Sequence, residues 1–421
     1  MISLSHLLEN PQLYRQNLSD RFKDPNLVDQ IQKIYEIWKE SQKKLDLVRQ
    51  QKNEFNKLVI SLKGEEKMAK ISEMKAVSES IKILEGETKE LKESLDNLIL
   101  KIPTPLSDNT PVGKSDLDNP VLQNFGQKPG FNFTPKPYWE LEVYKKFVSQ
   151  EDGVKAVGSR GYYLHGDVAL FQKVLFDYAL EVVLKHGFEL FYVPLMLNEK
   201  VLTGTGHIPD FDGQMYETKI DEDRSYYLIG SSEPSIMGYF MDKNLGEIIK
   251  PVLATCWSTC FRKEAGSYGK DQQGILRVHQ FEKVEMVAIA QPDQIETLFS
   301  KFRTIVEEIY SGLGICYQSV EVCSGDLPPK HTRQIDYEAW FPAVDKFREI
   351  CSNGNAADYQ NRGLRVSYKD HLGNSQTPFG LNCTAITFRT GLAIMEQFQT
   401  EDGRVKLPEV LKTKMGKEFL G

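Results

Sequence analysis

The sequence of 421 residues lacks the features that mark membrane, secreted or zinc-binding proteins. No apolar stretch approaches the ~20 residues that span a bilayer. The N-terminus has no basic segment followed by an apolar one, as a signal peptide has. The six cysteines are scattered, with no Cys-X-X-Cys pair and no histidine at zinc-finger spacing, which favours buried, reduced thiols and no structural zinc. We therefore expect a cytoplasmic protein without a membrane partner.

Two common phosphate-binding patterns are also missing, since the sequence has neither a GxxxxGK(S/T) P-loop nor a GxGxxG at the start of a helix. A bound nucleotide would need another geometry. The net charge of −7, from 52 basic and 59 acidic residues, argues against nonspecific coating of nucleic acids. It does not exclude one nucleic-acid partner held by a local patch.

Residues from about 28 to 102 follow a seven-residue apolar repeat, which is typical of a coiled coil. The series are Ile31, Trp38 and Leu45; Val48, Phe55 and Leu62; Met74, Ile81, Thr88 and Leu95; and Val77, Leu84, Leu91 and Leu98. A chain reversal at Gly64, between the two halves, predicts an antiparallel helical hairpin about 50 Å long at ~1.5 Å per residue. Such a hairpin would project as an arm.

The charges of this arm are nearly balanced, at 15 basic and 14 acidic, whereas the rest of the chain has 37 and 45. A less acidic arm weakly indicates an anionic partner. The alternative is a dimerisation coiled coil whose charged face is simply solvated.

The remainder of the chain predicts an α+β fold. Residues 103–120 are rich in Pro, Asp, Asn and Ser and indicate a linker. Helices are expected at 168–185 and 294–313, and the last helix at 390–400. Strands are expected at 188–194, 315–323 and 335–341, and a further pair on both sides of a loop within 261–289. Because strands recur without regular βαβ alternation, we expect a mostly antiparallel sheet flanked by helices. The predicted domains are residues 1–102, which include the arm, and residues 121–421, joined by the linker 103–120.

The most informative segment is FRKEAGSYGKDQQGILRVHQFEKVE, residues 261–285. Charges cluster in its Gly-rich middle and apolar residues at its ends, which predicts a strand, a polar loop and a second strand. Taken singly, Arg262, Glu264, Arg277 and Glu285 are ordinary surface ion-pair residues. Together on paired strands they would grip an anion and a cation, since arginine forks onto phosphate or carboxylate. A nucleotide plus an amino acid would require such a site.

This segment closely resembles motif 2 of the seryl-tRNA synthetases of the bacterial and eukaryotic type, which are class II aminoacyl-tRNA synthetases. The similarity continues in order along the chain. The hairpin is similar to the family's tRNA-binding arm, and residues 153–194 resemble motif 1, which ends at the dimer interface. GTGHIPDF (204–211), YEAWFP (337–342) and FREICSNGNAADYQNR (347–362) resemble further family segments, and residues 379–411 resemble motif 3 with its C-terminal tail.

The resemblance implies a homodimer with a class II catalytic domain. This enzyme would activate L-serine with ATP and Mg²⁺ to seryl-adenylate and then load the 3′ end of tRNA(Ser). Because the serine carboxylate attacks the α-phosphorus itself, no protein nucleophile is needed. The site must align two anions and neutralise the charge that spreads onto the leaving oxygens.

The resemblance also implies residue roles. Arg262 would bridge the α-phosphate and the serine carboxylate, Glu264 would contact the adenine amino group, and Phe281 would stack on the base. The full ATP-binding set is Arg262, Lys263, Glu264, Arg277, Val278, Phe281, Glu349, Ile350, Cys351, Ser352 and Arg389, with Glu349 and Ser352 also at the Mg²⁺. The serine-binding set is Ser231, Ser232, Glu233, Arg262, Glu285, Asn382 and Thr384, and the catalytic set is Arg262, Glu285 and Arg389.

The chain departs from the family pattern at four places. Ser231-Ser232-Glu233 stands where Thr-Ala-Glu is usual, residues 352–355 are SNGN in place of SCSN, and residues 361–363 are NRG in place of ARR. Motif 3 is slightly divergent, because the spacing from Asn382 to Arg389 is one residue short. One residue changes the facing of a helical side chain by ~100°. The residue types that the chemistry needs remain, so we expect an active enzyme.

Three other classes of protein stay open on these grounds. The first is a synthetase-like paralogue with a binding or regulatory role, for which these departures would be the evidence. A ligase that loads amino acids onto a carrier protein would share the motifs, although the long arm argues against it. A purely structural coiled-coil protein would not need motif 2.

Overall fold

The computed structural model describes residues 1–61, 63–210, 213–221, 224–248, 250–265 and 273–421. Leu62, Phe211 and residues 266–272 of the Gly-rich bend, all used above, lie outside the described residues. Contacts separate two compact units, residues 2–103 and residues 104–421 with Met1. The helical hairpin and the antiparallel sheet with its helices confirm the predicted α+β fold class.

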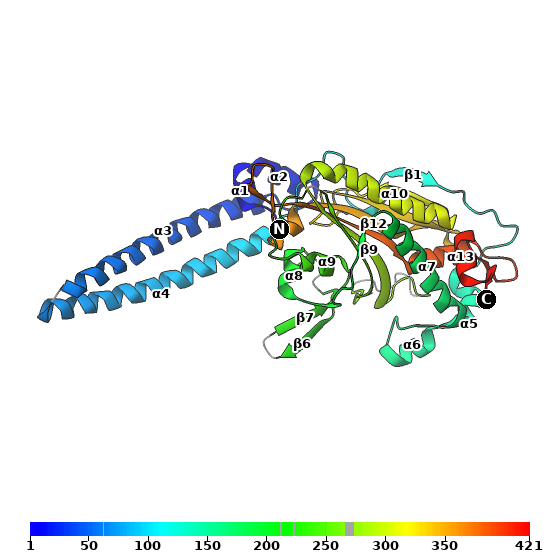
Figure 1. Cartoon of the computed structure of the whole chain (residues 1–421), viewed down its shortest axis with the longest axis horizontal. Helices are drawn as coiled ribbons and strands as arrows, with labels where there is room; N and C mark the ends of the chain where they lie inside the picture. Colours follow the sequence, from blue (N-terminus) through cyan, green and yellow to red (C-terminus); the bar gives the residue numbers. More distant parts are fainter. Residues whose placement is uncertain (62, 211–212, 222–223, 249, 266–272) are drawn as a thin grey trace. The chain divides into compact units, whose positions relative to one another are not determined.

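The smaller unit consists of helices. α1 (Leu4–Glu9) and α2 (Pro11–Asp20) precede α3 (Asn26–Ser61) and α4 (Gly64–Leu100), which lie side by side as an antiparallel hairpin (Figure 1). Each long helix spans about 55 Å at ~1.5 Å per residue. Gly64 opens α4 with a φ of +64°, in the left-handed region that glycine adopts most readily. This confirms the predicted reversal.

The seam between α3 and α4 follows the predicted heptads. Leu45 from α3 and Ile81 and Leu95 from α4 are all buried. Thr88, the polar member of its series, is buried too, and its hydroxyl lies 2.7 Å from the Ser41 hydroxyl of the facing helix. Because each hydroxyl has a partner, the polar pair is compatible with a buried seam.

An eight-stranded sheet forms the centre of the larger unit. Its strands pair antiparallel except for β4 with β8, which confirms the mostly antiparallel sheet. The strands in spatial order are β1 (Val121–Phe125), β10 (Tyr317–Glu321), β11 (Arg333–Phe341), β12 (Lys346–Ala357), β15 (Phe379–Thr387), β9 (Gln280–Ala290), β8 (Val252–Phe261) and β4 (Glu189–Leu190).

The remaining elements surround this sheet. The helices are α5 (Glu142–Phe147), α6 (Gln150–Val157), α7 (Gly166–Lys185), α8 (Glu199–Gly204), α9 (Glu233–Tyr239), α10 (Ile295–Leu313), α11 (Tyr359–Gly363), α12 (Phe388–Gln397) and α13 (Glu409–Met415). Small sheets pair β2 (Val148–Ser149) with β3 (Tyr163–Leu164), β7 (Arg224–Leu228) with β5 (Met196–Asn198) and β6 (Glu217–Asp221), β13 (Tyr368–Lys369) with β14 (Ser375–Gln376), and β16 (Val405–Lys406) with β17 (Phe419–Leu420).

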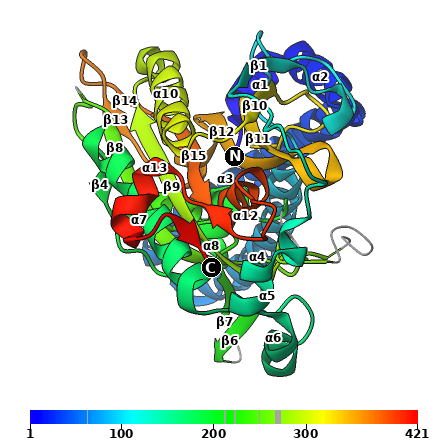
Figure 2. The same cartoon turned by 90° about the vertical axis from the view of Figure 1, so that its right-hand side faces the viewer.

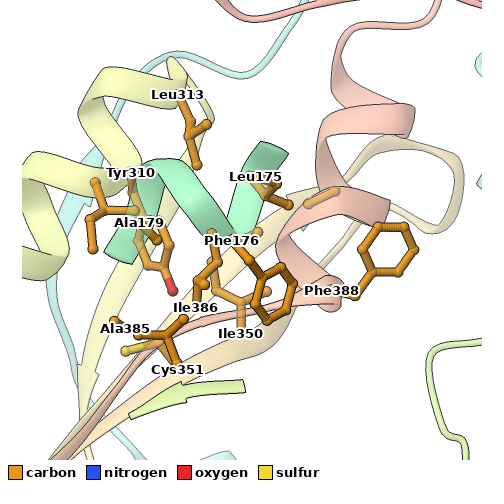
Figure 3. Close-up of a cluster of buried hydrophobic side chains, with 14 of the residues drawn as sticks. Leu175, Phe176, Ala179, Tyr310, Leu313, Ile350, Cys351, Ala385, Ile386 and Phe388 are labelled. Atoms are coloured by element: carbon orange, nitrogen blue, oxygen red, sulfur yellow. The ribbon is translucent and has the colours of Figure 1, made fainter. Parts of the chain in front are cut away.

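Helices α7 and α10 cover one face of the sheet, where they pack on β9, β12 and β15 with α13 beside them (Figure 2). Figure 3 shows the core that results, in which Phe176 of α7 and Tyr310 of α10 meet Ile386 of β15. Phe388, the first residue of α12, joins the same core. This packing anchors the start of α12 against the sheet.

The opposite face of β8 and β9 is buried by α8 and α9. Val287 and Ile289 of β9 pack there with Leu202 of α8 and Ile236 of α9. Successive residues of a strand point to opposite faces, so β9 is buried on both sides over most of its length. Polar side chains on β9 are therefore removed from water.

Most element positions agree with the sequence expectations, and three do not. α7, α10 and β9 lie where they were expected, whereas β8 ends at Phe261, where the first strand of the pair was expected to begin. The strand predicted over 188–194 is reduced to β4, because it lies at the sheet edge and pairs with β8 alone. The helix α12 is not the last one, since α13 follows it.

Residues 104–120 are attached to the larger unit. The backbone N–H of Thr104 donates to the Pro329 carbonyl at 2.8 Å, and that of Ser107 to the Thr332 carbonyl at 3.0 Å. Farther along, the Gly325 N–H donates to the Gly113 carbonyl at 2.9 Å. This irregular segment is therefore held by backbone hydrogen bonds rather than free.

Candidate active site

β8 and β9 carry the motif 2 residues to one end of the sheet. Their pairing runs from Val252 opposite Ile289 to Phe261 opposite Gln280. Just beyond it, the Arg262 N–H donates to the His279 carbonyl at 3.0 Å, and His279 Nδ1 lies 3.0 Å from the Arg262 carbonyl oxygen. The two chain segments are thus still held together where the Gly-rich bend begins.

A cavity of about 210 Å³ opens beside these segments. Its walls come from the β8–β9 connection, β12, β15 and α12, which are far apart in the sequence. Ten of the eleven residues that the resemblance assigns to ATP line it: Arg262, Glu264, Arg277, Val278, Phe281, Glu349, Ile350, Cys351, Ser352 and Arg389. The exception is Lys263, whose N–H donates to the Gln214 carbonyl at 2.7 Å and whose ammonium lies 5.9 Å from the centre of the Tyr216 ring.

Glu264 is held among arginines at the rim of this cavity. Its Oε2 lies 3.3 Å from Arg277 Nη1 and 3.8 Å from Arg160 Nη1. Its φ of +51° is in the left-handed region, which is uncommon for a residue with a Cβ. Such backbone strain is concentrated at functional positions.

Arg262 connects the cavity with the loop before α9. Its Nε donates to the Gly230 carbonyl at 3.1 Å, and its guanidinium lies 5.3 Å from the centre of the Phe281 ring. The same loop is tied to β8 by the Phe261 N–H, which donates to the Ile229 carbonyl at 2.7 Å. An anion at Arg262 would therefore lie next to the loop that carries Ser231.

The start of α12 places Arg389 in the cavity wall. α12 follows β15 directly, and its first residue, Phe388, packs edge-on against Phe171 of α7 with ring centres 6.2 Å apart. Arg389 Nη1 donates to the Glu349 carbonyl at 3.1 Å and lies 3.7 Å from Glu349 Oε2. The short motif 3 spacing thus does not remove Arg389 from the cavity.

Glu349 and Ser352 both line the cavity from β12. Carboxylate and hydroxyl oxygens are ligand types that suit Mg²⁺. In the parts of the chain that the structure describes, no three His, Cys, Asp or Glu side chains are grouped to hold a metal by themselves. Two protein oxygens fit an ion whose coordination is completed by nucleotide phosphates and water, which is how Mg²⁺ is usually bound.

Three of the predicted serine-binding residues meet around a lysine. Lys283 Nζ lies 2.7 Å from Glu285 Oε2, 2.9 Å from Ser231 Oγ and 3.4 Å from Thr384 Oγ1. The Thr384 hydroxyl also donates to Glu285 Oε2 at 3.3 Å. The β15–β9 register produces this contact, because it sets Thr384 opposite Glu285.

The Lys283–Glu285 pair is almost completely removed from water, with side chains 8% and 2% exposed. Burial raises the pKa of Glu285. Burial by itself would lower the pKa of Lys283, but the opposing interactions, of which that with the Glu285 carboxylate is the largest, together raise it. The close contact and the two hydroxyl partners favour the charged forms of both groups and so oppose the effect of burial.

Glu233 belongs to a second buried network. Its carboxylate accepts from Lys330 Nζ and from Gln360 Nε2, each at 2.7 Å, and lies 3.6 Å from His207 Nε2. Burial lowers the pKa of His207 to about 3, so its ring is neutral near pH 7. Burial would raise the pKa of Glu233, but the opposing interactions with Lys330, His207 and His331 together lower it. Glu233 therefore remains charged.

The predicted serine-binding residues that remain, Ser232 and Asn382, lie on two different segments near this region. Ser231 and Ser232 are buried just before α9, which begins at Glu233, and the Glu233 N–H donates to Ser231 Oγ at 3.3 Å. Asn382 lies on β15, where its Nδ2 is 2.9 Å from His331 Nε2. The fold thus brings Asn382 to His331.

Sequence reasoning missed the residues that complete both networks. Lys283 lies inside the motif 2 segment, and its alternation with Glu285 on a strand otherwise rich in apolar residues was a usable signal. His207 lies inside GTGHIPDF, at a position where the family pattern names no residue type. Lys330 and His331 come from the loop before β11, which has no local pattern, so only the fold brings them to Glu233 and Asn382.

The sheet and cavity are those of a class II aminoacyl-tRNA synthetase. Residues 216–398 match the class II core domain of the tRNA synthetases for G, H, P, S and T. Residues 1–105 match the seryl-tRNA synthetase N-terminal domain.

Relatives that match over most or all of their length assign the chain to one family within this class. The serine–tRNA ligase of Sulfurovum sp. is 36% identical over 420 residues, which cover 99% of this chain and 100% of the relative. That of Aliarcobacter butzleri is 40% identical over 329 residues, or 78% of this chain and 79% of the relative. The crystal structure of seryl-tRNA synthetase from Pyrococcus horikoshii complexed with ATP matches with a TM-score of 0.89 at 30% identity, covering 100% and 99% of the two chains. The chain belongs to the seryl-tRNA synthetase family.

Among the helices of the described residues, none combines the length and apolar character that a membrane span requires.

Proposed function

We propose that the chain activates L-serine in the 210 Å³ cavity and the adjoining lysine-centred cluster, and then transfers the seryl group to tRNA(Ser). Serine–tRNA ligase activity follows from its family membership. One observation supports the residue assignment above all. Arg262 and Thr384, two predicted serine-binding residues, and Lys283, which contacts Thr384, all line the cavity proposed to bind ATP. A nucleotide and an amino acid bound there would be neighbours.

ATP would be held by the three arginines of the cavity, Arg262, Arg277 and Arg389. Guanidinium groups suit phosphates because they donate two parallel hydrogen bonds. Arg277 now pairs with Glu264 at 3.3 Å, and ligand binding would exchange this ion pair for contacts to phosphate and to the adenine amino group. Phe281 would stack on the base, while the assignment of Lys263 to ATP stays a prediction.

The chemical step needs alignment and charge neutralisation rather than a protein nucleophile. The serine carboxylate attacks the α-phosphorus, a new phosphorus–oxygen bond forms, and pyrophosphate leaves. Arg262 is suited to bridge the two anions because it lines the cavity and its Nε also donates to the Gly230 carbonyl, in the loop that carries Ser231. Mg²⁺ held by Glu349 and Ser352 would supply further positive charge for the leaving oxygens.

Serine would be selected by polar groups that a small amino acid without a hydroxyl leaves unpaired. Ser231, Glu285 and Thr384 offer two hydroxyls and a carboxylate in a buried site. Alanine would leave part of this set without a partner, which is costly in a dry pocket. Glu233 and Asn382 would support the pocket through their contacts with Lys330 and His331, and Ser232 adjoins Ser231 in the loop before α9.

We also propose that residues 1–102 form a tRNA-binding domain with its arm at about 28–102, that 103–120 link it, and that 121–421 form the catalytic domain. The contact boundary after Pro103 and the family match over 1–105 support this division. Recognition of tRNA(Ser) by the arm, a homodimeric state and a cytoplasmic location are proposed from the family resemblance.

ATP–pyrophosphate exchange with serine, alanine and threonine tests the proposal. We expect exchange with serine at least about 100-fold above exchange with alanine, because polar contacts discriminate strongly. Absence of serine-dependent exchange would instead support the regulatory paralogue. Exchange without charging of tRNA would support the carrier-protein ligase.

A further inference from the structure

The Lys283 ammonium contacts the same groups that are proposed to receive serine. Its three contacts, at 2.7, 2.9 and 3.4 Å, are to Glu285, Ser231 and Thr384. An ammonium has three donors, so this arrangement satisfies a primary ammonium group. The α-ammonium of serine is the same chemical group.

The charges of the cluster leave no place for two ammonium groups. Glu285 carries one negative charge and is 2% exposed, and the nearby carboxylate of Glu233 is already paired with Lys330 at 2.7 Å. A second cation beside the same buried carboxylate would be repelled strongly, because the surroundings screen charge poorly. Serine can therefore bind at Glu285 only if Lys283 withdraws.

Lys283 has a destination for this movement. Its side chain also lines the cavity together with Arg262 and Ser352, where the proposed ATP phosphates would attract a cation. The lysine ammonium stands at the end of a flexible four-carbon stem. A change of rotamer can therefore carry it from the lysine-centred cluster to the nucleotide cavity.

Resting on the proposed function, we propose that Lys283 is a resident cation that occupies the serine-ammonium position in the empty site and is displaced toward the nucleotide cavity when serine binds. Lys283 then changes the specificity of the site, because it stays at Glu285 beside a ligand that has no ammonium and must leave for a ligand that brings its own. The displacement lowers the apparent affinity for serine, since the binding-competent arrangement must first be reached.

The test compares two ligands and two side chains by calorimetry in the absence of ATP. The ligands are L-serine and glycerate, which has a hydroxyl in place of the ammonium. In Lys283→Met the competitor is gone, so we expect serine to bind about tenfold tighter or more and glycerate about tenfold weaker than to the unaltered protein. Weaker binding of serine to Lys283→Met would overturn the inference and make Lys283 a mere support for Glu285.

Two controls separate this outcome from general damage. Lys301→Met removes a partly buried lysine whose ammonium donates to the His186 carbonyl at 2.8 Å outside the site, and it should leave both affinities unchanged. Lys283→Arg keeps the cation, so it should bind serine no more tightly than the unaltered protein. Tighter binding to this variant would contradict the inference.

The unaltered protein keeps the inference testable if Lys283→Met does not fold. Because Lys283 stands in for the missing ammonium, glycerate should bind within about 30-fold of serine. A preference for serine above about 1,000-fold would overturn the inference. Serine-dependent ATP–pyrophosphate exchange by the same sample distinguishes this failure from failure of the proposed function, which would abolish the exchange.

Discussion

The helical hairpin and the candidate active-site cavity are built in opposite ways. In the hairpin, α3 and α4 pack along one apolar seam, and ion pairs such as Arg49–Glu85, at 2.7 Å, lie on the surface, where each contributes at most about 1 kcal/mol. The cavity and the lysine-centred cluster combine residues from 231 to 389 and contain buried, paired charges such as Lys283–Glu285. Removing one partner of a buried pair strands the other charge. The hairpin should therefore tolerate single changes that the site does not.

The largest expected effect is that of Arg262→Ala in the cavity. Loss of the guanidinium that would bridge phosphate and carboxylate should reduce serine-dependent ATP–pyrophosphate exchange by about 1,000-fold or more. Arg365→Ala is the matched control, since Arg365 is half-exposed and donates from Nε to Asp242 at 2.6 Å. Exchange within tenfold of normal in Arg262→Ala would contradict the proposed role of Arg262.

A smaller and more selective effect is expected from shortening the hairpin. Replacing residues 35–95 with a short turn should leave exchange within about threefold of normal and reduce charging of tRNA(Ser) by about 100-fold, because phosphate contacts dominate such binding. Both rates are measured on one preparation, so loss of exchange reports damage to the larger unit. Unchanged charging would refute the proposed role of the arm.

The smallest expected effect is on stability and is specific to the larger unit. Glu396 is 1% exposed and accepts from the N–H groups of Tyr138 and Ala343, each at 3.1 Å. Burial raises its pKa from 4.5 to about 7. Between these values the unfolded chain releases a proton that the folded chain keeps, so stability falls as pH rises through this window and levels off above it.

The variant Glu396→Gln should abolish this contribution, which amounts to about 2–3 kcal/mol. Urea unfolding at pH 5 and pH 8 measures it as the difference in pH dependence between the variant and the unaltered protein. Glu409→Gln, at an 83% exposed side chain, is the control and should keep the original pH dependence. An equal loss of stability between pH 5 and pH 8 in both variants would show that another group is responsible.

The predictable parts of the structure are those with a local cause. The heptads of residues 28–102 predicted α3, α4 and the turn at Gly64, because each position in a hairpin seam is set by near neighbours in the sequence. The β8–β9 pair was predictable for the same reason, since a polar bend separates two apolar strands. The strand at 188–194 was overestimated, because sequence pattern does not show that β4 pairs with a single neighbour at the sheet edge.

For the site, the sequence by itself determined which residue types are present: two arginines and three glutamates in motif 2, an arginine in motif 3 and hydroxyls near 231 and 384. Only the tertiary structure decided which of them touch. The β15–β9 register sets Thr384 beside Glu285, and the fold brings Lys330 to Glu233 across 97 positions of the chain. The physical reason is that buried charges must find partners wherever the backbone places them, and no local pattern encodes a partner so distant in sequence.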